Sequence, residues 1–109
     1  MDIKELQEKI IQFRDKRDWK QFHNPKDLAI SMLLESAEVL EHFQWKNSEE
    51  MEEHLKKNRN EVADELADVF YWILLISYDL KIDLVKAVNR KMKENEKKSF
   101  IIGLTAHTT

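Results

Sequence analysis

The sequence predicts a single all-α domain, and three observations lead to this fold class. The chain has 109 residues but only one glycine and one proline, whereas a sheet protein needs turn residues at every strand reversal. Apolar side chains recur every three or four positions along most of the chain. Asparagine or aspartate, which begin helices well, precedes several of these periodic segments. We therefore expect a four-helix, bundle-like protein.

The helix boundaries follow from capping residues. Asp2 and Asn24 are expected N-caps, with Pro25 at the first position of the second helix, and Asp83 is expected to cap the last. Beyond Lys98 no helical period is visible, so we expect a domain over residues 1–98 and a tail over 99–109. The expected helices, including a short polar one before the long one, cover residues 2–16, 25–44, 48–58, 60–79 and 84–98.

Composition excludes several classes of protein. With no cysteine, a disulfide framework, a thiolate nucleophile and a zinc–thiolate site are excluded. A glycine-rich phosphate-binding loop is also excluded, because the only glycine is Gly103 in the expected tail. The formal charge of −3 argues against a nucleic-acid binder. No apolar stretch reaches the roughly 18 residues of a membrane span, and the charged N-terminus is unlike a secretory signal. We expect a cytoplasmic protein.

Acidic side chains interrupt two otherwise apolar helices. Advancing about 100° per residue from Leu28 leaves a narrow polar wedge of Ser31, Glu35, Glu38 and His42. Because the rest of this helix is apolar, we expect it to be buried on most sides. The long helix carries a comparable stripe, which comprises Glu61, Asp64, Glu65, Asp68, Trp72 and Asp79. Antiparallel packing would bring the two acidic stripes together.

Neither stripe has a cation to compensate it, since Lys and Arg are absent between Leu28 and Gln44 and between Asn60 and Asp79. An unpaired buried carboxylate costs of the order of several kcal/mol, unless its pKa rises or a cation binds. All-oxygen ligands favour hard cations, which predicts Mg²⁺ with Mn²⁺ as a possible substitute. The alternative is that these acids line a solvated groove, because acidic pairs are common in a chain with 21 acids.

Such a metal typically serves substrate phosphates and activates a water molecule, with a carboxylate as the base. Trp72, one turn beyond Asp68, is then either a stacking platform for a nucleobase or ordinary core. Trp19, His23 and Trp45 either line a pocket or cap the core. His42 and His54 are interpreted as ordinary helix residues.

The last helix offers two further polar candidates. Lys91 and Asn95 share a face with Leu84 and Val88, which would direct a cation and an amide towards the other helices. The alternative is a solvated, lysine-rich helix end that suits the helix dipole.

The acidic pairs Glu35-Ser-Ala-Glu38 and Glu65-Leu-Ala-Asp68 are separated by 26 residues. Together with the segments RDWKQFH, FQWK and KMKEN, they resemble the ExxE…ExxD signature and flanking motifs of the MazG-like nucleotide pyrophosphohydrolases, and within them the single-domain, dCTP pyrophosphatase-like branch. The resemblance covers about residues 2–98. It departs from that branch at Trp72, where a tyrosine is frequent, and at residues 97–100, where an Arg/Tyr/Pro-rich stretch is frequent.

The resemblance implies an all-α MazG fold and an enzyme that cleaves a nucleoside triphosphate between its α and β phosphates, with a deoxynucleotide such as dCTP as substrate and cleansing of the nucleotide pool as role. It implies that Glu35, Glu38, Glu65 and Asp68 bind Mg²⁺ or activate water. It places Trp19, His23 and Trp45 at the base, and Lys91 and Asn95 near phosphate or sugar. It also implies a dimer, or a tetramer of two dimers. The alternative function is a non-catalytic helical module with an acidic groove.

Overall fold

The expected all-α architecture is confirmed by a computed structural model, which describes the backbone of residues 1–106 and the side chains of residues 1–97. No strand occurs in this described part of the chain. None of its helices combines the length and apolar character that a bilayer-spanning segment requires. The elements in chain order are α1 (Ile3–Lys16), the short 3-10 helix η1 (Trp19–Phe22), α2 (Pro25–Glu41), α3 (Ser48–Asp79) and α4 (Leu84–Ala106).

Side-chain caps begin the helices as the sequence predicts. The carboxylate of Asp2 accepts from the backbone N–H of Glu5 at 2.8 Å, and Asn24 Oδ1 accepts from the N–H of Asp27 at 2.9 Å. Asp83 accepts from the N–H of Lys86 at 3.1 Å at the start of α4. These caps satisfy amides that have no partner inside a helix. Helix α3 begins with a reciprocal capping box between Asn47 and Glu50.

Some helix boundaries differ from expectation. The short polar helix and the long helix are one element, interrupted at Asn58, whose φ of −127° and ψ of 25° are not helical. This kink lies where the short helix was expected to end. Helix α2 ends at Glu41, before a turn that occupies the last expected positions. Helix α4 continues through residues 99–106, because neither Ser99 nor Gly103 is a strong enough breaker to end it. The side chains of the expected tail, 99–109, lie outside the described residues.

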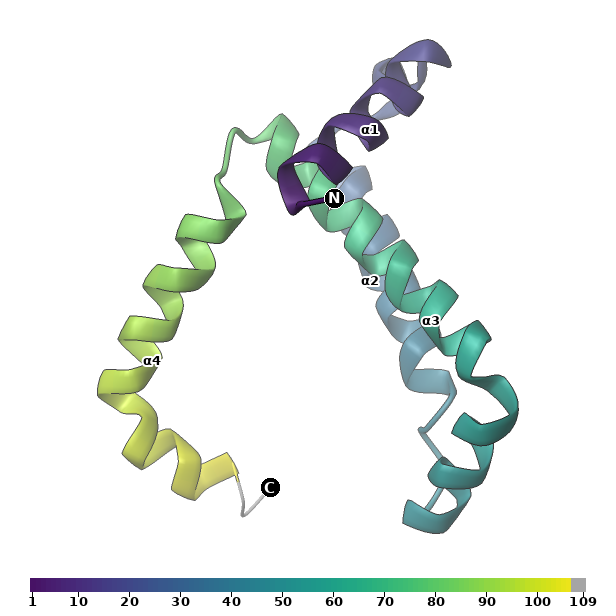
Figure 1. The fold of residues 1–109 in the computed structure, drawn as a ribbon, viewed down its shortest axis with the longest axis vertical. Coiled ribbons are helices and arrows are strands. Elements are labelled where there is room, and N and C mark those ends of the chain that lie inside the picture. The colour runs from purple at the N-terminus through teal and green to yellow at the C-terminus, as the bar shows by residue number, and fades with distance from the viewer. Residues whose placement is uncertain (107–109) are drawn as a thin grey trace.

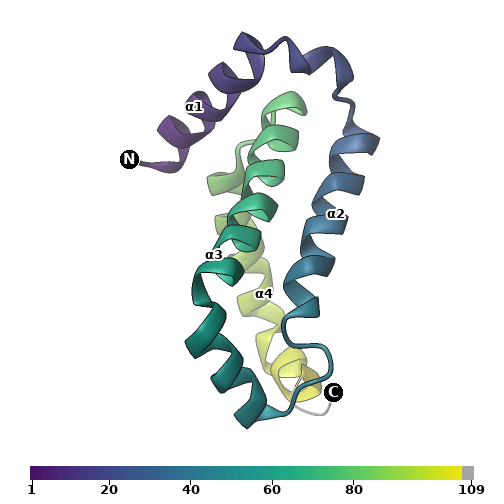
Figure 2. The ribbon, with the colours of Figure 1, turned by 90° about the vertical axis from the view of Figure 1, so that its right-hand side faces the viewer.

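Helices α2 and α3 form an antiparallel pair, and α1 lies across the C-terminal half of α3 (Figures 1 and 2). After a turn at residues 80–83, α4 leads away from the other helices (Figure 1). Within the described part of the chain, α4 has no contact with another helix comparable to that of α2 with α3. The expected four-helix bundle is therefore not closed within one chain.

The core lies where α1 and α2 meet the second half of α3. Leu28, Leu74 and Leu75 are fully buried, and Ile11 joins them from α1. The expectation that α2 is buried on most sides is wrong for the single chain, because Leu33 is 67% exposed and other apolar side chains of α2 are also accessible. One chain of this size does not provide enough surface to cover every apolar face of its helices.

Two polar contacts join α1 to α3. The guanidinium of Arg14, although completely buried, donates to both carboxylate oxygens of Asp79 at 2.8 and 2.9 Å. The hydrogen bonds with Arg14 hold the pKa of Asp79 below its ordinary value. Two turns earlier on the same helix, Gln7 Nε2 donates to the Leu74 carbonyl at 2.9 Å and to the Ser77 hydroxyl at 3.1 Å.

We expect Asp79→Asn to lower the free energy of unfolding by about 3–5 kcal/mol at neutral pH, because it leaves a buried guanidinium without its counter-charge. The loss should shrink as the pH falls below about 4, since the pKa of Asp79 is depressed in the folded state and protonation removes the same charge from the wild type. Denaturant unfolding followed by circular dichroism at several pH values measures both effects.

The matched control is Asp15→Asn, which removes an exposed carboxylate 3.9 Å from the Arg14 side chain. It should change stability by less than about 1 kcal/mol. Equal effects of the two substitutions, or a loss at Asp79 that does not depend on pH, would contradict the importance of the buried pair.

Candidate functional site

The four predicted carboxylates converge between α2 and α3. Glu35 and Glu38 lie on α2, and Glu65 and Asp68 lie on α3. The pKa of Glu35 is raised, first by desolvation and then by a hydrogen bond with Glu38 and by the negative charges of Glu38, Asp68 and Glu65. Antiparallel packing has therefore brought these four members of the two acidic stripes to one place, as predicted. Asp79 of the α3 stripe is instead paired with Arg14.

One buried carboxylate oxygen at this place lacks a partner. Glu35 Oε2 is buried and accepts no hydrogen bond. Within residues 1–97, none of the four acids forms an ion pair with a Lys or Arg; only Glu65 has a charged contact, with His42. In the same range, no three His, Asp or Glu side chains already surround a single point closely enough to hold a metal ion. The chemistry of this donor set, four carboxylates with a buried unpaired oxygen, nevertheless fits a hard cation.

Two histidines, interpreted from the sequence as ordinary helix residues, adjoin this cluster. His42, the residue after the end of α2, contacts Glu65 Oε2 with its Nε2 atom. Its other ring nitrogen, Nδ1, lies 2.6 Å from Nε2 of His54 on α3. The sequence indicates part of this arrangement, since His42 follows Glu38 by one helical turn on the same polar wedge. The sequence does not indicate the contact of His54 with His42, because that contact depends on how α3 folds back against α2.

Two of the predicted base-contacting residues lie together. The rings of His23 and Trp72 meet edge to face, with centroids 5.9 Å apart, although they come from the segment before α2 and from α3. His23 Nδ1 is buried and has no hydrogen-bond partner. Desolvation lowers the pKa of His23, and the Arg14 charge lowers it further. Trp72 is half-buried one turn from Asp68, so this pair borders the acids and presents an unpaired ring nitrogen.

The other two tryptophans are at opposite ends of α2. Trp19 stands before the helix, where its ring packs edge-on against Phe13, while Trp45 follows the helix and is 86% exposed. The 17 residues of α2 span about 25 Å. A single base therefore cannot contact both Trp19 and Trp45 of one chain.

Lys91 and Asn95 are not brought to the acids within one chain. Both are exposed on α4, which leads away from α2 and α3. Lys91 Nζ lies 3.6 Å from the carboxylate of Glu94 on its own helix.

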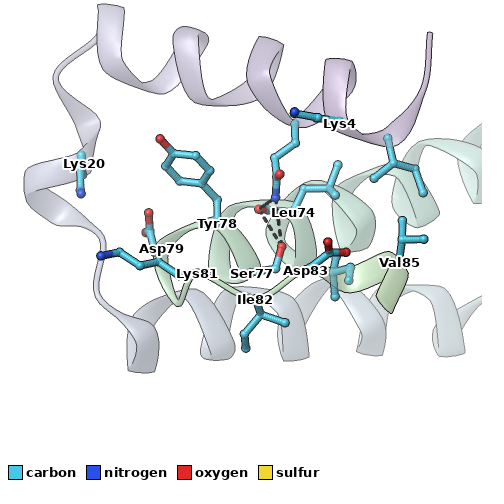
Figure 3. Close-up of a pocket in the computed structure, with 13 residues that line it drawn as sticks. Lys4, Lys20, Leu74, Ser77, Tyr78, Asp79, Lys81, Ile82, Asp83 and Val85 are labelled. Carbon is cyan, nitrogen blue, oxygen red and sulfur yellow. Dashed lines mark hydrogen bonds between the residues drawn. The ribbon is translucent and has the colours of Figure 1, made fainter. Parts of the chain in front are cut away.

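A separate pocket of about 760 Å³ lies at the turn between α3 and α4, beside α1 (Figure 3). Its lining includes Lys4, Lys20 and Lys81 together with Asp79 and Asp83. None of the predicted site residues lines it. Two of its polar lining residues already have partners, because Asp79 binds Arg14 and Ser77 binds Gln7.

Comparison with known proteins places the chain in a family. Residues 30–104, which include all four acids, match the model of the MazG-like family. The chain belongs to the MazG-like family. It is similar to a crystal structure of a pyrophosphatase from Archaeoglobus fulgidus, with a TM-score of 0.84, 42% identity, and coverage of 88% of this chain and 90% of the other.

Curated relatives of this MazG-like chain carry a more specific name. It is 33% identical over 99 residues to dCTP pyrophosphatase 1 of Bos taurus and 32% identical to that of Homo sapiens. These alignments cover 89% of this chain but only 57% and 56% of the two relatives. The MazG-like chain thus spans little more than half the length of the curated relatives it matches.

In metal-free protein, Glu35→Gln should raise the midpoint of thermal unfolding by about a few °C. A gain of about 1 kcal/mol in the free energy of unfolding produces a shift of this size in a domain of about 100 residues. The amide keeps the size of the side chain but removes its repulsion with Glu38, Glu65 and Asp68. Differential scanning calorimetry in a chelating buffer measures the shift. The control Glu52→Gln neutralises an exposed acid of α3 and should leave the midpoint unchanged; a lower midpoint for Glu35→Gln would contradict the repulsion.

Proposed function

We propose that this protein is a Mg²⁺-dependent nucleoside triphosphate pyrophosphohydrolase that converts a deoxynucleotide such as dCTP and water to the monophosphate and pyrophosphate. The observation that carries the proposal is the convergence of Glu35 with Glu38, Glu65 and Asp68 in a place that has no Lys or Arg ion pair within residues 1–97. Relatives named dCTP pyrophosphatase 1 and a structural neighbour named a pyrophosphatase support the reaction class. Cleansing of the nucleotide pool is the role that fits this reaction.

The four carboxylates would hold the metal. When bound, Mg²⁺ supplies neutralisation of phosphate charge and a lowered pKa of bound water. Glu35, Glu38, Glu65 and Asp68 would supply oxygen ligands, and within residues 1–97 no Lys or Arg ion pair competes for them. A carboxylate oxygen that is not a ligand accepts the proton that water loses as it adds to phosphorus, while the bond between the α and β phosphates breaks.

The pair of His23 and Trp72 would receive the base. The two rings border the acids, and base stacking on an aromatic ring contributes about 1–3 kcal/mol. His23 Nδ1, buried without a partner, is available to a polar atom of the base. Trp19, Trp45, Lys91 and Asn95 remain predicted contacts. Because α4 leads away from the acids, Lys91 and Asn95 would reach a nucleotide only at a site that a second copy of the chain completes.

We expect purified protein to release pyrophosphate from dCTP with Mg²⁺ or Mn²⁺, and EDTA to abolish the release. Glu38→Gln and Asp68→Asn should each lower kcat by about 100-fold or more, because each removes a ligand or the base. A coupled pyrophosphate assay with a panel of nucleoside triphosphates measures both activity and base preference.

Glu52→Gln is the control, since it removes an acid of α3 outside the cluster and should keep wild-type activity. A protein that leaves every triphosphate intact with either metal would refute the enzyme. If such a protein took up no divalent ion in calorimetry and bound basic peptides in EDTA, the acidic groove would instead be a protein-binding surface.

We further propose that the chain associates as a dimer or as a tetramer of two dimers. Large apolar side chains are exposed on three helices: Leu33 67%, Leu34 60%, Leu66 53%, Val88 54% and Met92 63%. A monomer rarely leaves so much apolar surface in contact with water.

Size-exclusion chromatography with light scattering should therefore give two or four times the chain mass of 13.1 kDa. Leu33→Glu should shift the population towards the monomer, because a charge buried in an apolar interface costs several kcal/mol. A wild-type mass of one chain at micromolar concentration would contradict the association.

A further inference from the structure

A chain of polar groups runs from the kink of α3 to the acidic cluster. Asn58, the residue with non-helical dihedral angles, and His54, one turn before it, lie on α3. His42 lies opposite them at the end of α2, and Glu65 follows on α3 after the kink. His42 is mostly buried, with 11% of its side chain exposed, so its ring nitrogens depend on protein partners.

The first link fixes the orientation of the Asn58 amide. Asn58 Nδ2 lies 3.2 Å from the carbonyl oxygen of His54 and 3.3 Å from His54 Nδ1. A carbonyl oxygen can only accept a hydrogen bond, so the group facing it must be the NH₂ end of the amide. The same NH₂ group faces His54 Nδ1, which must therefore accept. Because a neutral imidazole carries one proton, that of His54 is on Nε2.

The second link follows from the first. His54 Nε2, which carries the proton, lies 2.6 Å from His42 Nδ1 and donates to it. His42 then carries its own proton on Nε2, the atom that contacts Glu65 Oε2. Both of these atoms are buried, and neither has another hydrogen-bond partner within residues 1–97. Each is thus the only available partner of the other.

Every proton in this chain points the same way, from the Asn58 amide to the Glu65 carboxylate. The opposite direction is excluded at both ends, since the His54 carbonyl and the Glu65 carboxylate accept only. Burial also favours the neutral form of His54, whose pKa is lowered by desolvation and by the nearby Lys46 and His42. Neighbouring hydrogen bonds in such a row polarise and strengthen one another.

We propose that Asn58, His54 and His42 form a one-directional hydrogen-bond relay that fixes Glu65 Oε2 and leaves the other oxygen of Glu65 for a divalent metal ion. This role rests on the proposed function, because it takes Glu65 as a metal ligand. The three residues are positioning residues, since they act through Glu65. Hydrogen-bonding partners of metal ligands typically contribute about 10- to 100-fold to metal affinity.

The kink of α3 lies at Asn58, the first residue of this relay. A side chain that enters the backbone hydrogen-bond ladder is one of the few causes of a sharp helix kink. The departure of α3 from regular geometry and the contact that sets the tautomer of His54 thus occur at one residue, Asn58.

The first test locates the protons in metal-free wild-type protein. Long-range ¹H–¹⁵N correlation spectra at pH 8, above the ordinary histidine pKa, should show His42 and His54 both as Nε2–H tautomers. A Nδ1–H tautomer at either residue would overturn the relay. This readout does not depend on hydrolysis, and a protein with the expected tautomers but without activity on any triphosphate would refute the proposed enzyme and not the relay.

The second test measures Mn²⁺ binding through the electron paramagnetic resonance signal of the free ion, with Mg²⁺ as competitor. His42→Phe keeps an aromatic ring but removes the donor to Glu65, and affinity should fall about 10-fold or more. Asn58→Asp provides a second route that does not depend on how a phenylalanine packs at position 42. A carboxylate at position 58 can only accept. With both rings neutral at pH 8, each histidine must then carry its proton on Nδ1, which turns a lone pair of His42 towards Glu65.

Asn60→Asp is the matched control for this second variant. It adds the same charge two positions along the same helix, at an exposed residue. Simple attraction of the cation by added charge would strengthen metal binding in both variants. The relay instead predicts weaker binding for Asn58→Asp alone, together with its changed tautomers. Wild-type affinity in both His42→Phe and Asn58→Asp would overturn the proposal.

Discussion

The antiparallel packing of α2 against α3 is the constraint on which the rest of this structure depends. Apolar side chains at one end of the pair, among them Leu28, Leu74 and Leu75, are fully buried and drive the association. The same contact brings four carboxylates together near its middle, where the charges of Glu38, Asp68 and Glu65 raise the pKa of Glu35. The hydrophobic contact therefore holds in place a group of charges that would separate if they were free. Departures of this kind from good local chemistry are typical of functional sites.

Much of this arrangement is encoded locally and could be predicted. The caps at Asp2, Asn24 and Asp83 work through hydrogen bonds to amides three residues away, so sequence alone specifies them. The acidic stripes are likewise a matter of helical periodicity. Their meeting needed only one further assumption, that consecutive helices joined by a short turn pack antiparallel, and the raised pKa of Glu35 agrees with it.

What could not be predicted depends on distant parts of the chain. The partnership of Arg14 with Asp79 joins residues 65 positions apart, and nothing local distinguishes Arg14 from exposed cations of α1. The direction of α4 is set by a turn in which Lys81 adopts a positive φ of 56°, an angle that its residue type does not favour. His42 and His54 appeared ordinary because their rings meet only after the turn following α2 has formed.

The contacts of Gln7 and Arg14 have a consequence for how the protein can vary. Seven residues apart on α1, they bind α3 at two points, and a shift of α1 by one residue would leave a buried guanidinium without its carboxylate. The register of α1 is thus set by α3 itself and not by the segment that joins α1 to α2. Insertions or deletions in that segment cost only a small closure entropy. Homologues can therefore differ in the length of this connection and keep the first helix in the same place.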